Sequence, residues 1–425
     1  MRISSVLFLA LSDSDNWDLN RNVRTALKRT FGRVTNYFYR DRLAEIGFWA
    51  MQQELIAVAR RAEPDFVLWP VSSYEVHEST LVALKAMKMP VVAWFFDDPI
   101  RFESMSVWAA PYVDAAMTAD PASVGLYSSL QLPAIACPMA CNPALYEQET
   151  REPVHDVSFV GSGIGDRAEW LSAFRDSGVN VQCFGRGWGE LLPWTEVARV
   201  FQSSRVNLNF AGGYDLSATK QLKARVFEVT MAGGFLLTEY SEGLEDYFLP
   251  DVEIGVFSCR DEAIEKAGFY LAHEDGRLAI AARGHARALR DHTWDRRLGD
   301  VARRLESLTI APDRGREILL ASGSTLLMGR CAYHADRSTN ALLGGSRDEA
   351  RDAAMLALSY DHANRRALGL LFAAFLPRPL GECAFSLQAR LFKLYSATRG
   401  RMRIRVRATA LGSWLAASHK GGTRR

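Results

Sequence analysis

The segment that decides the fold is residues 220–238, which read Lys220-Gln-Leu-Lys223-Ala-Arg225-Val-Phe-Glu228-Val-Thr-Met-Ala-Gly233-Gly234-Phe-Leu-Leu-Thr238. The order of residue types indicates a cationic loop, a helix that carries one acid, a glycine break and an apolar strand. The exposed N–H groups of a helix N-terminus favour negative charge, and three cations stand beside this one. The segment therefore predicts an α/β unit with a diphosphate site where the helix begins.

The acid in this helix allows two interpretations. Glu228 could accept hydrogen bonds from a ribose diol next to the diphosphate. Alternatively, Arg225 and Glu228 form an ordinary ion pair three residues apart on an amphipathic helix. The segment alone does not favour one over the other.

Outward from this segment, short apolar runs alternate with helical patterns, which is typical of helices packed around parallel sheets. The alternation stops at a proline-bearing stretch near residues 138–155 and then restarts. We therefore expect an α/β fold with two Rossmann-like domains, residues 1–145 and 150–308, facing each other across a cleft, and an α-helical extension over residues 310–425. The predicted strands are Ile3–Leu11, Val34–Tyr39, Phe66–Val71, Val91–Phe96 and Asp114–Thr118 in the first domain, and Val157–Val160, Val179–Phe184, Val206–Phe210, Phe235–Thr238 and Ile254–Phe257 in the second.

The composition is that of an ordinary globular protein. Of 425 residues, 48% are hydrophobic and 24% charged, which argues against a disordered or membrane-spanning chain. The apolar N-terminal run ends in acids without a small-residue cleavage site, so it predicts a strand and not a signal peptide. Neither the six cysteines nor the eight histidines show metal-ligand spacing. We expect a cytoplasmic protein with reduced thiols and no metal.

The C-terminal tail is the one strongly basic segment, because Cys383–Arg425 contains ten Lys or Arg residues and no Asp or Glu. Alternation from Arg399 to Arg407 would gather arginines on one side of an extended segment. One interpretation is peripheral contact with an anionic membrane at its inner face. The other is an extra strand or a disordered terminus with solvated arginines. No recognition motif accompanies the charge, so nucleic acid is not expected as a partner.

Two loops that follow strands of the second domain contain glycines. Gly161-Ser162-Gly-Ile-Gly-Asp-Arg167 permits close approach of a phosphate, which Arg167 could bind through two N–H groups. In the second loop, Trp188 could stack on a base or pack between the domains. The acid of a dinucleotide-binding fingerprint is missing at its expected distance, so NAD is not expected.

Acids near strand ends of the first domain are candidates for a general base. Asp13, Asp15 and Asp18 lie in the loop after the first strand, whereas Asp97 and Asp98 directly follow an apolar strand. The alternative role of each acid is to cap a helix.

Together these motifs resemble the sugar-donor signature of glycosyltransferases with two Rossmann-like domains, the GT-B architecture, and most closely the CgeB-like (spore-maturation-type) branch. The resemblance covers roughly residues 1–305. Many retaining members carry two glutamates separated by seven residues; Glu228 fits the second, and Lys220 occupies the place of the first. The segments that agree in order are Trp94–Pro99, Asp156–Ser162, Arg205–Asn209, Lys220–Thr238 and His292–Trp294.

The resemblance implies a glycosyltransferase of polysaccharide biosynthesis that uses a nucleotide-sugar donor, a glycan, lipid-linked or other hydroxyl acceptor, and no metal. Basic residues and a helix dipole would stabilise the leaving diphosphate instead. Two alternatives are an inactive GT-B scaffold that binds nucleotide or glycan, which the lysine at position 220 favours, and a sugar-nucleotide epimerase. The expected donor-binding residues are Gly161, Ser162, Arg167, Trp188, Asn209, Lys220, Arg225, Glu228 and Gly233, and the catalytic candidates are Asp13, Asp97, Asp98 and Lys220.

Overall fold

The computed structural model describes residues 3–13, 19–72, 75–149, 151–189, 191–212 and 220–308, and, further on, residues 334–335, 338, 347–360 and 365–375. The chain divides into two compact units, residues 1–321 and 322–425. The basic tail Cys383–Arg425 and the loop acids Asp15 and Asp18 lie outside the described residues.

The first domain is built on a parallel sheet of six strands in the order β2-β1-β3-β4-β5-β6. Strands β1, β3, β4 and β5 are buried along their whole length, as expected for a parallel sheet covered on both faces. The strands are β1 (Ser5–Ala10), β2 (Arg33–Phe38), β3 (Phe66–Pro70), β4 (Val91–Phe95), β5 (Ala115–Thr118) and β6 (Ala134–Ala136).

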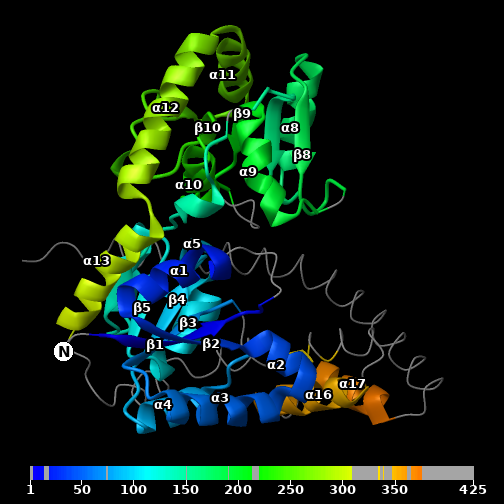
Figure 1. Ribbon diagram of the computed structural model, residues 1–425. Coiled ribbons are helices and arrows are strands. Elements are labelled where there is room, and N and C mark those ends of the chain that lie inside the picture. The colour runs from blue at the N-terminus through cyan, green and yellow to red at the C-terminus, as the bar shows by residue number, and fades with distance from the viewer. Residues whose placement is uncertain are drawn as a thin grey trace, which may run out of the picture. The chain divides into compact units, whose positions relative to one another are not determined.

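Helices cover both faces of this sheet (Figure 1). Gly47, with a φ of 82°, ends α2 and separates it from α3. A π-helical turn at Phe102–Ser106 joins α5 to α6. The helices of the first domain are α1 (Leu19–Phe31), α2 (Tyr39–Ile46), α3 (Phe48–Ala62), α4 (Glu78–Ala86), α5 (Asp98–Arg101), α6 (Val107–Ala109) and α7 (Val124–Ser128).

The second domain has a parallel sheet of five strands in the order β11-β10-β9-β7-β8. Separate apolar clusters fill its two faces, one formed largely with α9 and α10 and the other with α8 and α11. Its strands are β7 (His155–Val160), β8 (Val181–Phe184), β9 (Ser204–Asn209), β10 (Leu236–Glu239) and β11 (Gly255–Phe257). Its helices are α8 (Arg167–Asp176), α9 (Trp194–Gln202), α10 (Ala224–Met231), α11 (Arg260–Ala272) and α12 (Glu274–Asp291).

Two parallel sheets with flanking helices confirm the predicted fold class. All ten predicted strands are present, with ends shifted by one or two residues. The sequence prediction missed β6, whose three residues are too few to give a periodic pattern.

Helix α13 (Trp294–Ser307) differs from the sequence prediction, which placed it on the second domain. It packs instead on the first sheet, beside α1 (Figure 1). Trp294 is 1% exposed, and its ring meets that of Trp94 edge to face at 5.4 Å. The amphipathic pattern predicted which face of α13 is buried, but it contained no information about which of the two sheets that face packs on.

The connections between the two domains are joined by backbone hydrogen bonds. The amide of Cys141 donates to the carbonyl of His292, and the amide of Trp294 donates to that of Cys141, each at 3.0 Å. The His292 ring is buried and contacts the Tyr247 carbonyl at 2.9 Å. Burial lowers the pKa of His292 to about 4, so the ring is neutral at physiological pH.

The described part of the second unit contains α16 (Arg347–Tyr360) and α17 (Arg365–Phe375), which confirm helical structure in the extension. Small side chains let the two helices pack closely, with Ala354 and Ala357 against Ala367 and Leu370. Among the described residues, no helix combines the length and apolar character needed to span a membrane.

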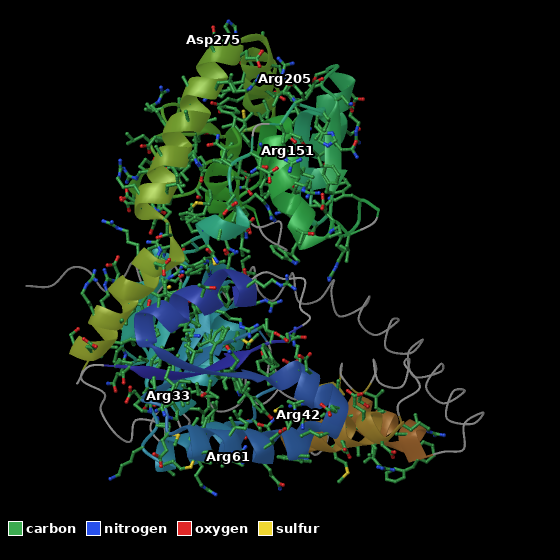
Figure 2. All side chains as sticks on the ribbon, in the orientation of Figure 1. Arg33, Arg42, Arg61, Arg151, Arg205 and Asp275 are labelled. Atoms are coloured by element: carbon green, nitrogen blue, oxygen red, sulfur yellow. The ribbon has the colours of Figure 1, made fainter. Side chains whose placement is uncertain are left out.

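Ion pairs between charged side chains connect neighbouring elements at the surface (Figure 2). Arg42 on α2 pairs with Glu54 on α3 at 2.8 Å, and Arg205 on β9 pairs with Asp156 on β7 at 3.4 Å. Ion pairs this close to solvent contribute at most about 1 kcal/mol each, so the stability of the fold rests mainly on the apolar clusters.

Helix α12 supplies a test of this packing. A Cβ at Gly284 would overlap the Glu253 carbonyl oxygen, whereas a Cβ at Gly276, on the same helix, would meet nothing within 4 Å. Gly284→Ala should lower the free energy of unfolding by about 1–3 kcal/mol through overpacking. Gly276→Ala should raise it by up to about 1 kcal/mol through helix propensity. Urea unfolding of both variants measures the difference; equal effects would show that α12 does not approach this carbonyl closely.

Candidate functional site

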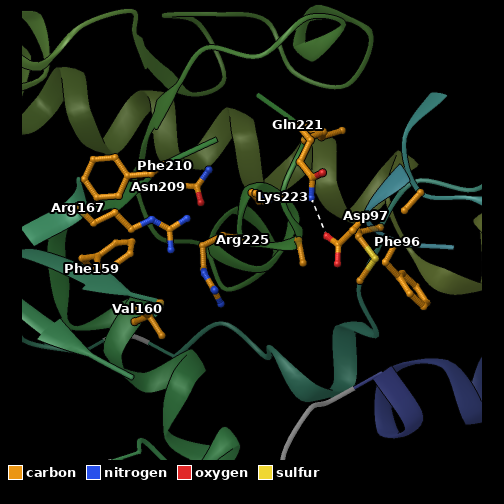
Figure 3. A pocket seen from close by; sticks show the side chains of 15 residues that line it. Phe96, Asp97, Phe159, Val160, Arg167, Asn209, Phe210, Gln221, Lys223 and Arg225 are labelled. Carbon is orange, nitrogen blue, oxygen red and sulfur yellow. Dashed lines mark hydrogen bonds between the residues drawn. The ribbon is translucent and has the colours of Figure 1, made fainter. Parts of the chain in front are cut away.

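A cavity of about 170 Å³ lies at the carboxyl ends of both sheets (Figure 3). The first domain contributes residues that follow β4, β5 and β6, and the second contributes residues that follow β7 and β9 together with the start of α10. This is where open parallel sheets bind ligands. The lining residues are Phe96, Asp97, Ala119, Met139, Phe159, Val160, Gly161, Arg167, Asn209, Phe210, Gln221, Leu222, Lys223, Ala224 and Arg225.

Three cations enter this cavity. Lys223 and Arg225 stand at the N-terminus of α10, and Arg167 begins α8 (Figure 3). The N-cap residue of α10, Lys223, makes no side-chain hydrogen bond to the first turn. The amides of that turn and the three positive side chains together favour an anion with more than one negative charge.

Arg167 is held in place from two sides. Its guanidinium donates to the Ser162 carbonyl at 2.9 Å and to the Gly212 carbonyl at 2.8 Å. The same group lies over the rings of Phe159 and Phe210, 5.6 and 5.9 Å from their centroids. These contacts fix the orientation of the guanidinium before any ligand arrives.

Lys223 is the cation of this site whose charge changes near neutral pH. Burial lowers the pKa of its ammonium group to about 8; Asp97 opposes the shift, and Arg167 and Arg225 add to it. An anion in the cavity would restore the charged form, because it compensates both burial and like-charge repulsion.

Lys220 is not among the residues that line the cavity. Its ammonium group pairs with Glu239 at 3.1 Å. Glu239 is 9% exposed and also accepts hydrogen bonds from the amides of Ala211 at 2.9 Å and Gly212 at 3.3 Å. Sequence reasoning missed Glu239, although an acid that ends an apolar strand was a signal comparable to the one used for Asp97.

The structure shows one of the two interactions considered for the acid of α10. Glu228 lies outside the cavity lining and pairs with Arg225 at 3.0 Å, as the ion-pair interpretation predicts. Gly233, also expected at the site, ends α10 with a φ of 79°, and a Cβ there would overlap the side chain of Gln148. Its observed contacts are structural.

The glycine loops after β7 and β8 pack on one another. The amide of Gly161 donates to Phe184, and Trp188 Nε1 donates to the Gly161 carbonyl at 2.9 Å. Trp188 therefore stabilises the loop that contains Gly161 and Ser162. Asn209 lines the cavity while its amide donates to Thr238 Oγ1 at 2.9 Å.

The acids of the first domain occupy three different environments. Asp97 lines the cavity and accepts a hydrogen bond from Gln221 Nε2 at 3.1 Å, which joins the two domains (Figure 3). Asp98 is buried, accepts from Ser106 and Tyr127, and has a pKa raised by burial. Asp13 is exposed, pairs with Arg24 at 2.9 Å and lines neither this cavity nor the smaller one described below.

The smaller cavity, of about 90 Å³, lies in the first domain. Asp98, Arg101 and Ser72 line it, and it shares Phe96 and Asp97 with the larger cavity. Asp97 thus faces both spaces. Among the described residues, no group of three or more His, Cys, Asp or Glu side chains could hold a metal ion.

Comparison with known proteins connects this geometry to a family. Residues 167–303, which contain Arg167, α10 and Glu239, match a family model described as glycosyl transferase-like. This segment is similar to glycosyltransferases, and the two-sheet fold is that of the GT-B architecture. No curated protein matches it.

Solved structures share the fold at low sequence identity. The Anabaena protein HepE, solved in complex with UDP and glucose, matches with a TM-score of 0.52 and 10% identity over 72% of this chain and 100% of that chain. A glycosyltransferase from Rickettsia africae matches with a TM-score of 0.50 and 6% identity over the same shares of the two chains. At these identities the likeness concerns the fold alone.

The titration of Lys223 predicts how this cavity binds anions. Sulfate keeps the same charge from pH 7 to 9, while Lys223, with a pKa of about 8, changes from mostly charged to mostly neutral. Sulfate affinity should therefore fall about tenfold over this range at constant ionic strength. In Lys223→Arg the affinity should stay constant, because arginine remains charged. Calorimetric titration measures both; equal pH dependence in the two proteins would assign it to another group.

Proposed function

We propose that the enzyme transfers a sugar from a nucleoside-diphosphate sugar, with uridine as the base, to a hydroxyl acceptor. The observation that carries this proposal is the cavity in which Arg167, Lys223 and Arg225 surround the uncapped N-terminus of α10. A leaving nucleoside diphosphate gains negative charge in the transition state, and fixed cations and amides there stabilise it. The complex of HepE with UDP and glucose supports uridine as the first base to test.

The donor residues have distinct roles in this proposal. Arg167, Lys223 and Arg225 bind the diphosphate, and the loop of Gly161 and Ser162 lies close to it. Glu228, which pairs with Arg225, orients that arginine and accepts the ribose hydroxyls when donor is bound. Because cations and a helix dipole supply the positive charge, we propose that the reaction needs no metal.

On the acceptor side we propose Asp97 as the acid that contacts the reacting hydroxyl. It faces both cavities and lies beside the cations that bind the leaving group. The neighbouring Asp98 is enclosed by Ser106 and Tyr127, so it supports the turn into α5. A carboxylate in the position of Asp97 can accept the proton of an acceptor hydroxyl or orient that hydroxyl.

The wider setting is also a proposal. We place the chain in the CgeB-like branch, in the cytoplasm, acting in polysaccharide biosynthesis on a glycan or lipid-linked acceptor. The basic tail would bring it to an anionic membrane surface. A second candidate is an inactive scaffold of the same fold, which is favoured by the pairing of Lys220 with Glu239 instead of with a ligand.

A panel of UDP-, GDP- and dTDP-sugars, assayed with EDTA present, tests this function. We expect hydrolysis or transfer from a UDP-sugar, and a fall in kcat of about 10²–10³-fold in Arg167→Ala and Arg225→Ala. Arg175→Ala, an exposed position on α8, is the matched control and should keep native turnover. Binding of UDP without turnover of any donor would favour the scaffold. Activity that EDTA abolishes and a divalent ion restores would overturn the metal-free mechanism.

Asp97→Asn tests the acceptor side. Asparagine retains an oxygen that can accept the hydrogen bond from Gln221 but loses the charge and the basicity. Transfer should fall at least about 10²-fold, the usual contribution of a general base, while UDP affinity stays equal or rises because a nearby negative charge is gone. Single-turnover transfer and UDP titration separate the two effects. Native turnover in the variant would remove Asp97 from the chemistry.

A further inference from the structure

Glu239 occupies a position that the proposed chemistry does not use. It is the last residue of β10, a strand with neighbours on both sides, and its carboxylate is buried. Oε2 accepts hydrogen bonds from the amides of Ala211 and Gly212, and Oε1 forms an ion pair with Lys220. A buried carboxylate is stable only when donors or a counter-charge replace water, and here both are present.

The three donors come from the two ends of one connection. Ala211 and Gly212 follow β9, whereas Lys220 stands just before α10, and an antiparallel bridge joins Gly212 to Lys220. Glu239 therefore binds both ends of the β9–α10 connection to the centre of the second sheet.

Both ends lead directly to residues of the cavity. The Gly212 carbonyl accepts a hydrogen bond from Arg167 at 2.8 Å. The Ala211 carbonyl accepts a hydrogen bond from the backbone amide of Gln221 at 3.1 Å. The side chain of Gln221 in turn donates a hydrogen bond to Asp97 (Figure 3). A displacement of residues 211–212 would thus move a partner of Arg167 on one side and of Gln221 on the other.

We propose that Glu239 is a positioning residue of the donor site. Its charge, compensated by Lys220, holds the ends of the β9–α10 connection so that Arg167 and Gln221 keep their places at the cavity. Lys220 then serves the site through Glu239 and not by contact with the donor. This inference rests on the proposed function, because it treats Arg167 as a ligand of the donor diphosphate.

Charge, and not shape alone, is what the proposal requires. In Glu239→Gln the amide oxygen can replace only one of the two carboxylate oxygens, and an NH₂ group takes the place of the other, which faces either Lys220 or the two backbone N–H groups. This NH₂ group then faces another hydrogen-bond donor. One of the contacts is lost, although the volume of the side chain hardly changes. The connection should loosen without creating a cavity in the core.

UDP titration of the full chain tests the proposal. We expect Glu239→Gln to weaken UDP binding at least tenfold. Glu262→Gln is the matched control, since Glu262 also accepts a backbone amide, from Ser258 at 2.8 Å, and pairs with a lysine, Lys266, at 3.2 Å, but lies away from the cavity. Glu262→Gln should bind UDP as the native protein does.

A double-variant cycle separates positioning from general destabilisation. If Glu239 acts through Arg167, the Glu239→Gln change should alter UDP affinity less than twofold in an Arg167→Ala background. Native affinity in Glu239→Gln, or the same loss with and without Arg167, would overturn the proposal. A loss in Glu262→Gln equal to that in Glu239→Gln would overturn it too.

Hydrogen exchange gives a readout that does not depend on UDP. Amide exchange at Ala211, Gly212 and Gln221 should accelerate in Glu239→Gln and stay unchanged in Glu262→Gln. If the native protein binds no UDP, the proposed function fails; unchanged exchange at these amides would then refute the role of Glu239 on its own evidence.

Discussion

The site depends on one electrostatic constraint, the crowding of three positive side chains around a single cavity. Like charges in a partly desolvated space repel each other, so each cation needs compensation to stay there. Arg167 receives it from two carbonyls and two aromatic faces, and Arg225 from Glu228. Burial and the neighbouring arginines lower the pKa of Lys223, and the attraction of Asp97 offsets only part of this effect. An anionic ligand would offset both burial and like-charge repulsion, so the site favours binding of a phosphate.

The same constraint explains why the surrounding backbone is so closely tied. The loops after β7 and β8 hold each other through Gly161 and Trp188, and the loop after β9 is held by Glu239. A carbonyl that compensates an arginine is useful only at a fixed distance. The glycines and the buried carboxylate of Glu239 therefore keep these carbonyls at the distance at which they compensate the arginine, in addition to stabilising the fold.

The sequence was sufficient to predict the elements but not all of their partners. Apolar runs identified the strands, because burial on both faces leaves a local pattern. Of the three cations predicted beside α10, Lys223 and Arg225 line the cavity, whereas Lys220 pairs with Glu239. The Arg225–Glu228 pair was one of two predicted outcomes, since residues three apart on a helix are neighbours on its surface. By contrast, the packing of α13 on the first sheet and the contact of Glu239 with Ala211 depend on residues far apart in the chain. No local periodicity encodes such contacts.

The paired connections between the domains also decide what a change in either of them would do. Cys141 and Thr293 form a parallel bridge, and α13, the helix that follows Thr293, packs in the core of the first domain. The chain therefore enters and leaves the second domain side by side, and each connection has a backbone partner in the other. A substitution that breaks this bridge would loosen both connections at once.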